Sequence, residues 1–390
     1  MKKIIATILA LTLVLALFAG FASAEEIQYK GEIKIGGLAP MTGPYAEFGK
    51  GFKYSWEKAI DEINAAGGAN GWKLVIDVRD TQGDAVQCTT LATEFCEDEE
   101  YKLILGEFAS TNCLAITDII DRYGIVQLSP TCSSPMFATG SIYNFSINGL
   151  TSIEGMFAAK YIVGEYLGGK NCVVLRANND WSEATVKPFA EQCEREGIEI
   201  LLDEKYQVDE TDFSSIVTKV RALDPDVVVI MDQGTAISAI CNACNAVGYD
   251  VPTMNIGAPG SQQVADQLVK KNLYCLATFV FDPEYKELEA WRQQFVADNG
   301  YEPTTHSVQA HDTVWLLKAA IEKIGDGEIT RESLREALYC LEIDGFGGKI
   351  IFNPEGDITR RALYIMQVSE DDGLWHVQLK REFDPAEFYA

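Results

Sequence analysis

Residues 103–135, LILGEFASTNCLAITDIIDRYGIVQLSPTCSSP, carry the pattern that decides the fold. The stretch opens with an apolar run of strand length at 103–106, and a second such run follows at 125–128. Between the two runs, apolar residues recur at helical spacing from Leu114 to Ile120. A strand, a helix and a strand in so short a stretch predict one βαβ unit of a parallel sheet.

Each of these two strands is followed by a loop that is rich in hydroxyl groups. The first loop contains Ser110, Thr111 and Asn112, and the second spans 129–135. Parallel strands end at the same edge of a sheet, and open α/β sheets bind ligands at that edge. The first loop also precedes a helix, whose free N–H groups and dipole favour an anion such as a carboxylate. The alternative is that these polar residues only cap helices and turns.

Along the rest of the chain, segments with the pattern of a strand alternate with segments that have the apolar spacing of a helix. This alternation predicts an α/β fold with mainly parallel, doubly wound sheets. The alternation starts twice, at residue 32 and again after residue 150, and it ends in a β-rich tail. The expected strands, besides the two above, are 32–38, 73–78, 143–147, 172–177, 198–206, 227–231, 253–256, 276–280, 349–352, 364–368 and 374–380. The expected helices, besides that of the opening unit, are 49–65, 85–96, 152–167, 183–196, 213–223, 235–247, 261–268, 285–298, 307–324 and 331–341.

The N-terminus has the features of a secretory signal peptide. Two lysines precede an apolar run from Ile4 to Phe21, and Ala22-Ser23-Ala24 matches the small-x-small pattern of a cleavage site. We expect residues 1–24 to be removed and the mature protein to be exported and soluble, in the periplasm or outside the cell. An uncleaved membrane anchor is the alternative, because the run approaches the length that spans a bilayer.

Length and charge narrow the classes of protein that need to be considered. After removal of the leader about 366 of the 390 residues remain, too many for one typical core, so two domains are expected. The formal net charge of −26 makes nucleic acid and anionic lipid improbable partners. It says little about a small ligand, because a binding site is local.

Ten cysteines in an exported chain make disulfide bonds plausible. The pairings that we favour join Cys88 with Cys113 and Cys172 with Cys193, because their predicted elements are neighbours. A CxxC sequence at 241–244 lies inside a helical pattern and has no second CxxC at zinc-site spacing. We therefore predict neither a metal nor a redox role for it.

The motifs of common catalytic and cofactor sites are not found. No GxGxxG follows the first strand, and the sequence contains neither HExxH nor GxSxG. His306 and His311 stand at the head of a predicted helix, where a structural or surface role is favoured. We therefore expect no cofactor, no metal and no enzymatic activity. An exported α/β enzyme remains the alternative, because distant residues can assemble a site.

Several segments together resemble one family, the leucine/isoleucine/valine-binding type of type I periplasmic binding proteins, which serve ATP-driven (ABC) importers. The matching segments are 33–36, 40–44, 60–68 (IDEINAAGG), 104–106 with Ser110, 129–130 and 352–357. The resemblance covers residues 32 to 380. It implies two Rossmann-like lobes that three crossovers join and that close on a ligand by hinge motion. The implied lobes are 31–147 with 281–350 and 148–280 with 351–390.

The resemblance also assigns roles to residues of the first lobe. Ser110, with its neighbour Thr111, and Ser133 would hold the carboxylate of the ligand, and the backbone carbonyl of Thr131 would contribute to recognition of an amino group. From the loop after the first strand, either Tyr45 or Phe48 would supply an aromatic wall.

From the second lobe, Trp181 would cover the ligand. Amino acid binders of this type carry an acidic residue in the loop that here reads IGAPGS, at 256–261, and this loop contains no acid. Asp232, with Gln233 beside it, and Asp180 are the candidates to replace it. A buried ammonium without a partner costs several kcal/mol, which weighs against a simple α-amino acid as ligand.

The sequence therefore predicts a monomeric, exported binding protein that delivers a small carboxylate to the membrane permease of an ABC importer. Branched-chain amino acids are what the resemblance implies, whereas the missing acid favours an aromatic or aliphatic acid without an amine. A ligand-sensing module that signals to a membrane receptor has the same fold and is the second hypothesis.

Overall fold

The structure of the protein, a computed structural model, describes residues 27–149, 151–270, 272–281, 284–339, 341–352 and 362–382. The expected signal peptide, Cys340 and most of the turn at 352–357 lie outside these residues. Within the described part, no helix combines the length and the apolar character that crossing a membrane requires.

The first sheet has five parallel strands in the order β2-β1-β3-β4-β5. These strands are β1 (Gly31–Ala39), β2 (Trp72–Asp80), β3 (Tyr101–Leu105), β4 (Val126–Ser129) and β5 (Asn144–Ser146). Strands β3 and β4 are parallel neighbours, with Leu103 opposite Val126. The βαβ unit that the opening stretch predicts is confirmed, and its two hydroxyl-rich loops leave the same edge of the sheet.

Helices from both ends of the chain cover this sheet. They are α2 (Ala46–Ala65), α3 (Ala85–Glu97), α4 (Ser110–Tyr123), α5 (Pro135–Gly140), α12 (Thr305–Ile324) and α13 (Arg331–Tyr339). Helix α12 packs on α2, where the indole nitrogen of Trp56 donates to the Thr313 hydroxyl at 3.2 Å. The guanidinium of Arg331 donates to backbone carbonyls of the early chain, including those of Tyr101 and Tyr123. The late helices are thus tied to the first sheet.

The second sheet has seven strands in the order β14-β13-β10-β9-β8-β6-β7. Its parallel strands are β6 (Asn171–Ala177), β7 (Glu199–Tyr206), β8 (Val227–Met231), β9 (Thr253–Ile256) and β10 (Leu273–Ala277), and its antiparallel strands are β13 (Ala362–Val368) and β14 (Trp375–Glu382). The helices that follow or flank them are α6 (Thr151–Phe157), the π-helix η1 (Ala158–Tyr166), α7 (Asp180–Glu196), α8 (Ser214–Leu223), α9 (Ala236–Ala246) and α10 (Gln262–Gln267). Helix α11 (Lys286–Asn299) follows β10 but packs on α2, where Phe295 contacts Tyr54. A separate hairpin joins β11 (Glu342–Gly345) to β12 (Gly348–Ile351).

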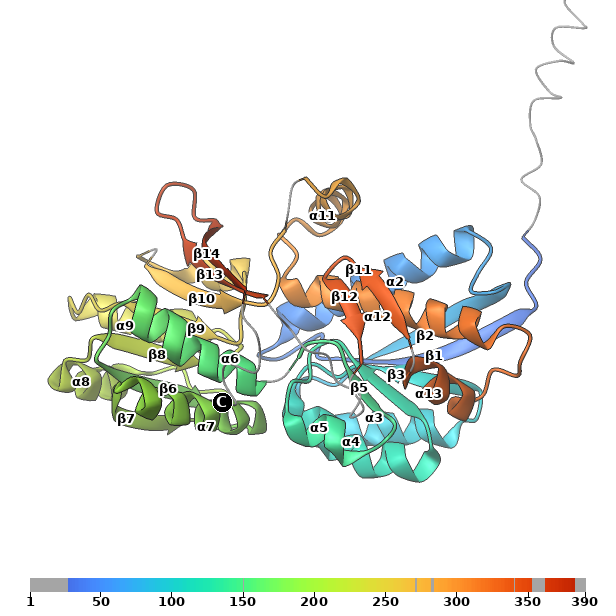
Figure 1. Cartoon of the computed structure of the whole chain (residues 1–390), viewed down its shortest axis with the longest axis horizontal. Helices are drawn as coiled ribbons and strands as arrows, with labels where there is room; N and C mark the ends of the chain where they lie inside the picture. The colour runs from blue at the N-terminus through green and yellow to red at the C-terminus, as the bar shows by residue number, and fades with distance from the viewer. Residues whose placement is uncertain are drawn as a thin grey trace, which may run out of the picture.

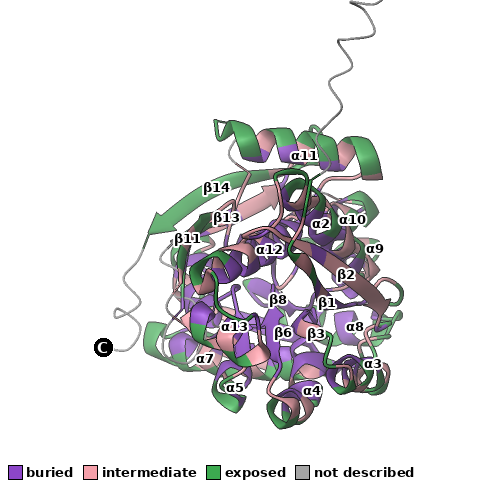
Figure 2. Cartoon of the chain, turned by 90° about the vertical axis from the view of Figure 1, so that its right-hand side faces the viewer, coloured by how far each residue is buried: buried purple, intermediate pink, exposed green. Residues whose placement is uncertain are grey.

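The local sequence explains the central elements. Strand β8, Val-Val-Val-Ile-Met, is buried along its whole length, as expected for a parallel strand with helices on both faces. Helix α4 ends at Gly124, whose φ of 57° places it in the left-handed conformation typical of a helix C-cap. Figure 2 shows the same layering, with buried strands inside and helices whose outer faces are exposed.

Three expectations differ from the structure. The single helix expected at 152–167 is divided into α6 and the π-helix η1. The strand expected at 276–280 is β10 at Leu273–Ala277, because pairing with β9 sets its start and the following apolar residues leave the sheet. The nine described cysteines are free thiols, so neither pairing that we favoured is present. The four cysteines of those pairings are buried in apolar clusters, which accounts for their positions without a bond.

The two sheets form two α/β bodies that lie side by side in Figure 1. The chain passes from the first sheet to the second between β5 and α6, returns between β10 and α12, and crosses again between β12 and β13. This is the fold class that the sequence predicts. The carboxyl ends of the parallel strands in both sheets face the space between the bodies.

Candidate ligand-binding site

An outer pocket of ≈370 Å³ opens between the two bodies at the carboxyl ends of their strands. The residues that line it follow strands β1, β2 and β3 of the first sheet and strands β6, β7 and β8 of the second. Five residues predicted for the site line it together, namely Tyr45, Ser110, Thr111, Trp181 and Gln233. The pocket therefore combines candidates that are far apart in the sequence.

Ser110 and Thr111 form the first turn of α4. Ala109 precedes the helix in an extended conformation, so the N–H groups of this turn point out of the helix end. Ser110 is buried, and its hydroxyl accepts a weak hydrogen bond from the Cys132 thiol at 3.7 Å. The hydroxyl of Thr111 accepts the backbone N–H of Asp180 at 3.2 Å. That bond joins the two bodies beside the helix end.

The loop after β4 lies behind the pocket. The Thr131 hydroxyl donates to the Phe108 carbonyl at 2.9 Å, and the Ser129 hydroxyl accepts the Thr131 N–H at 3.2 Å. Ser133 is fully buried, and its hydroxyl has no hydrogen-bond partner within the described structure. Neither Thr131 nor Ser133 is among the residues that line the outer pocket. Hydrogen bonds thus hold the loop in place, and the Ser133 hydroxyl remains able to bond to a ligand.

Of the two aromatic candidates, the structure places Tyr45 in the pocket. The Tyr45 ring packs against Phe108 with ring centroids 5.2 Å apart, and its side chain lines the pocket wall. Phe48 stacks on Phe108 at 4.5 Å and meets the edge of His306 at 5.4 Å, and it lines neither cavity described for the site. Phe48 therefore supports the aromatic wall from behind.

Asp232 is not brought to the pocket surface. Its carboxylate accepts the hydroxyl of Tyr206 at 2.6 Å and the backbone N–H groups of Gln233 and Gly234 at 2.6 and 2.7 Å. Burial raises the pKa of Asp232 above its usual range. Its oxygens are occupied by its own loop and by Tyr206 of β7, whereas Asp180, the other candidate, lines the pocket.

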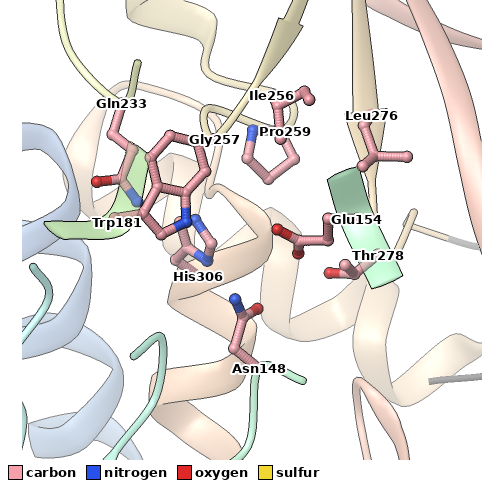
Figure 3. A pocket seen from close by; sticks show the side chains of 10 residues that line it. All are labelled: Asn148, Glu154, Trp181, Gln233, Ile256, Gly257, Pro259, Leu276, Thr278 and His306. Atoms are coloured by element: carbon pink, nitrogen blue, oxygen red, sulfur yellow. The ribbon is translucent and has the colours of Figure 1, made fainter. Parts of the chain in front are cut away.

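Behind the outer pocket lies an inner cavity of ≈20 Å³, which is room for about one water molecule (Figure 3). It is lined by Asn148, Glu154, Trp181, Gln233, Ile256, Gly257, Pro259, Leu276, Thr278 and His306. Trp181 and Gln233 line both spaces, so they form the partition between them.

Three buried polar atoms of the inner cavity have no hydrogen-bond partner within the described structure. They are Gln233 Oε1, Thr278 Oγ1 and His306 Nε2. The other ring nitrogen of His306 lies 2.7 Å from Gln309 Oε1. Burial lowers the pKa of His306 to about 4, so its ring is neutral at pH 7. Unpaired buried polar atoms are costly, so the cavity suits a water or a ligand group that hydrogen-bonds to them.

The inner cavity contains residues that the sequence did not single out for the site. Glu154 is buried on α6 and brings a carboxylate to the cavity wall, and Thr278 follows β10. In Figure 3 the two side chains lie on the opposite side of the cavity from Trp181 and Gln233. His306, to which we assigned a structural or surface role, lines the cavity as well. No spacing motif marks these residues, because the crossovers bring them together.

A second contact also joins the two bodies at the cleft. Glu47 of α2 accepts the Ser261 hydroxyl at 2.6 Å, at the start of α10. Burial raises the pKa of the Glu47 carboxyl. Within the described residues, no group of three or more His, Cys, Asp or Glu side chains is arranged to hold a metal ion.

Comparison with known proteins gives three consistent findings. A sequence profile of the family described as "Periplasmic binding protein" matches residues 32–373. The leucine-, isoleucine-, valine-, threonine- and alanine-binding protein of Pseudomonas aeruginosa is 26% identical in an alignment of 363 residues that covers 91% of this chain and 95% of the relative.

Solved structures have the same fold. The branched-chain amino acid transporter substrate binding protein of Streptococcus pneumoniae, in complex with isoleucine, has a TM-score of 0.80 at 22% identity and covers 91% of this chain and 100% of its own. A solute binding protein of an ABC transporter from R. palustris, in complex with benzoate, has a TM-score of 0.81 at 19% identity, with coverages of 90% and 96%.

Proposed function

The chain belongs to the periplasmic binding protein family, and we propose that it binds a small organic carboxylate between its two halves and delivers it to the membrane permease of an ABC importer. The observation that carries this proposal is the end of α4 at the outer pocket. There, Ser110 and Thr111 present hydroxyl and N–H groups at a helix N-terminus, the preferred place for an anion.

The buried hydroxyl of Ser133 supports the same assignment. It has no partner within the described structure and belongs to the neighbouring loop at the same sheet edge. A ligand carboxylate has two oxygens, and together they would use the hydroxyls of Ser110 and Ser133. The Thr131 carbonyl stays a candidate for a neighbouring donor group of the ligand.

We propose that the two halves are lobes made of 31–147 with 281–350 and of 148–280 with 351–390. The three crossovers between the sheets and the ties of α12 and α13 to the first sheet support these boundaries. The Thr111–Asp180 and Glu47–Ser261 contacts would then separate when the lobes open.

The class of ligand follows from what the relatives share. The solved structures similar to this chain hold isoleucine in one case and benzoate in the other, and both are carboxylates. We propose a ligand of this size, either an amino acid or an aromatic or aliphatic acid, which the chain binds without changing it. We also propose that the protein is exported and that its leader is cleaved after Ala24.

A thermal-shift screen of the full mature chain tests this proposal. The panel would contain the branched-chain amino acids, benzoate, hydroxybenzoates and short fatty acids, with the corresponding alcohols and amides as controls that lack the carboxylate. A ligand at a hundred times its Kd adds about 2.7 kcal/mol to the free energy of unfolding. Stabilisation by acids but not by their amides supports the proposal. Equal stabilisation by both would contradict it.

A further inference from the structure

A second carboxylate lies directly behind the predicted anion site. Glu107 follows β3 and is fully buried. One of its side-chain oxygens, Oε2, accepts the backbone N–H of Ala109 at 2.8 Å, and the other accepts the hydroxyl of Thr81. Its backbone carbonyl accepts the Ser129 hydroxyl at 2.9 Å. Glu107 thus connects the loop after β2, the start of α4 and the loop after β4.

Glu107 and the proposed ligand therefore use the same helix end. Ala109 is the residue that precedes α4, and its N–H group already donates to Glu107. The N–H groups of Ser110 and Thr111 are the next ones along the first turn. The positive end of a helix dipole is equivalent to about half an elementary charge, which does not balance two full negative charges. Two carboxylates that share a site do not both remain ionised easily, and the pKa of one of them rises.

We propose that the ligand carboxylate binds at Ser110 together with a proton, which Glu107 takes up from the solvent. This inference rests on the proposed function. Oε2 of Glu107 faces an N–H donor and must remain an acceptor, so the new O–H bond forms on Oε1. The Thr81 hydroxyl, which donates to the ionised carboxylate, then rotates and accepts that proton.

The surroundings of Glu107 make it the group that titrates near neutral pH. Burial raises the pKa of Glu107 to about 7. The thiols that face it, Cys88 of α3 and Cys113 of α4, have pKa values well above the usual range because they are buried. Burial likewise raises the pKa of the Tyr45 hydroxyl. All three groups stay neutral between pH 5.5 and 8.5.

Two further ionisable side chains lie near Glu107. His306 of α12 meets Phe108, the residue after Glu107, with ring centroids 5.7 Å apart, and its pKa of about 4 keeps it neutral over the same range. Asp84, at the start of α3, is exposed and contributes a solvated negative charge. The remaining neighbours from the loops after β2 and β4, Thr81 and Ser129, do not titrate.

Isothermal titration calorimetry of the full mature chain with L-leucine and with benzoate tests the proposal. Each titration would be run at pH 5.5, 7.0 and 8.5 in two buffers of different ionisation enthalpy, which reveals protons taken up on binding. We expect uptake of about half a proton at pH 7.0, where free Glu107 is half ionised, and an affinity at least about tenfold weaker at pH 8.5 than at pH 5.5.

Two variants identify the group. Glu107→Gln mimics the protonated acid, so we expect it to bind without proton uptake and with the same affinity at all three pH values. Glu47→Gln, which changes a partly buried glutamate at the contact between the two bodies, should keep the uptake. In Thr81→Val the ionised form of Glu107 loses a donor, so the pH at which affinity falls should move upward, a shift that a purely structural role would not produce.

If a variant does not fold, the wild-type measurement still tests whether a proton is taken up on binding. Binding of either acid with no proton uptake and no pH dependence would overturn this inference and leave the proposed function intact. Uptake that persists in Glu107→Gln or disappears in Glu47→Gln would assign the proton to another group and also overturn it. If neither these nor any other acid of the panel binds, the proposed function and this inference fail together.

Discussion

The outer pocket and the inner cavity share Trp181 and Gln233, yet they differ in kind. The outer pocket, at ≈370 Å³, is large enough for a small ligand, and a helix end and hydroxyl groups form its wall on the side of the first sheet. The inner cavity, at ≈20 Å³, admits one water-sized group and contains three polar atoms without partners in the described structure. Under the proposed function, the outer pocket would supply affinity for a carboxylate, and the inner cavity would select among carboxylates.

The largest effect is expected from the wall of the outer pocket. Ser110→Ala combined with Ser133→Ala should weaken the binding of L-leucine or benzoate by about a hundredfold or more, because each lost hydrogen bond to a charged group is worth about 1.5–3 kcal/mol. Calorimetry at constant pH measures this change. Ser215→Ala, on the exposed side of α8, is the matched control. Unchanged affinity in the double variant would remove both residues from the site.

The buried histidine of the inner cavity should make the free energy of unfolding depend on pH. The pKa of His306 falls from 6.5 to about 4 on burial, so between these values the unfolded chain binds more protons than the folded chain. Stability should therefore rise with pH across this window, by up to about 3 kcal/mol from this residue. Urea unfolding at pH 4.5 and pH 7 should show a smaller difference for His306→Gln than for the wild type.

The exposed His376 provides the control for that comparison, because His376→Gln removes a histidine from the surface of β14. A pH dependence that is reduced equally by both substitutions would show that burial of His306 in the cavity wall is not the cause.

The partition between the two spaces is tested by Trp181. Trp181→Ala opens the cavity to the pocket and removes a large buried aromatic surface, so ligand affinity should fall by about 2 kcal/mol, or about thirtyfold. Trp181→Phe, which retains an aromatic wall, should lose much less. Equal affinities of the two variants in calorimetry would mean that Trp181 packs within its own lobe and does not cover the ligand.

The smallest effect should distinguish one ligand from another. Gln233 Oε1 has no partner in the described structure, so Gln233→Leu removes an acceptor that only a ligand with a hydrogen-bond donor can use. We expect the affinity for L-leucine to fall about fivefold, near 1 kcal/mol, while the affinity for benzoate stays the same. An equal loss of affinity for both ligands would show that Gln233 does not accept a hydrogen bond from a donor group of the ligand.

The sequence predicted the order of elements well, because periodicity is a local property. The run from 103 to 135 became β3, α4 and β4 with its two loops at one sheet edge, as the alternation of apolar runs indicated. Helix α4 starts at Ser110, so the residues that we expected in the loop before the helix form its first turn. Less was predictable for 152–167 and for the strand expected at 276–280, because a π-helix and a strand start depend on what the segments pack against.

The residues of the candidate site also fall into those that the sequence indicated and those that only the structure revealed. The hydroxyls of Ser110 and Thr111 were identifiable because they follow a predicted strand. The ring of Tyr45 was expected only from the family resemblance, as one of two candidates, and it lines the same pocket. No sequence pattern marks Glu154 or Thr278, which belong to the crossovers.

The amino-acid sequence by itself determined two alternating α/β series, an anion-favouring helix end and the absence of the usual acid from the loop at 256–261. Only the tertiary structure decided that Asp232 is occupied by its own loop and by Tyr206, and that Glu107 accepts the N–H group at the start of α4. The reason is that periodicity and capping act over a few residues, whereas burial, charge and unpaired polar atoms depend on contacts between segments up to hundreds of positions apart.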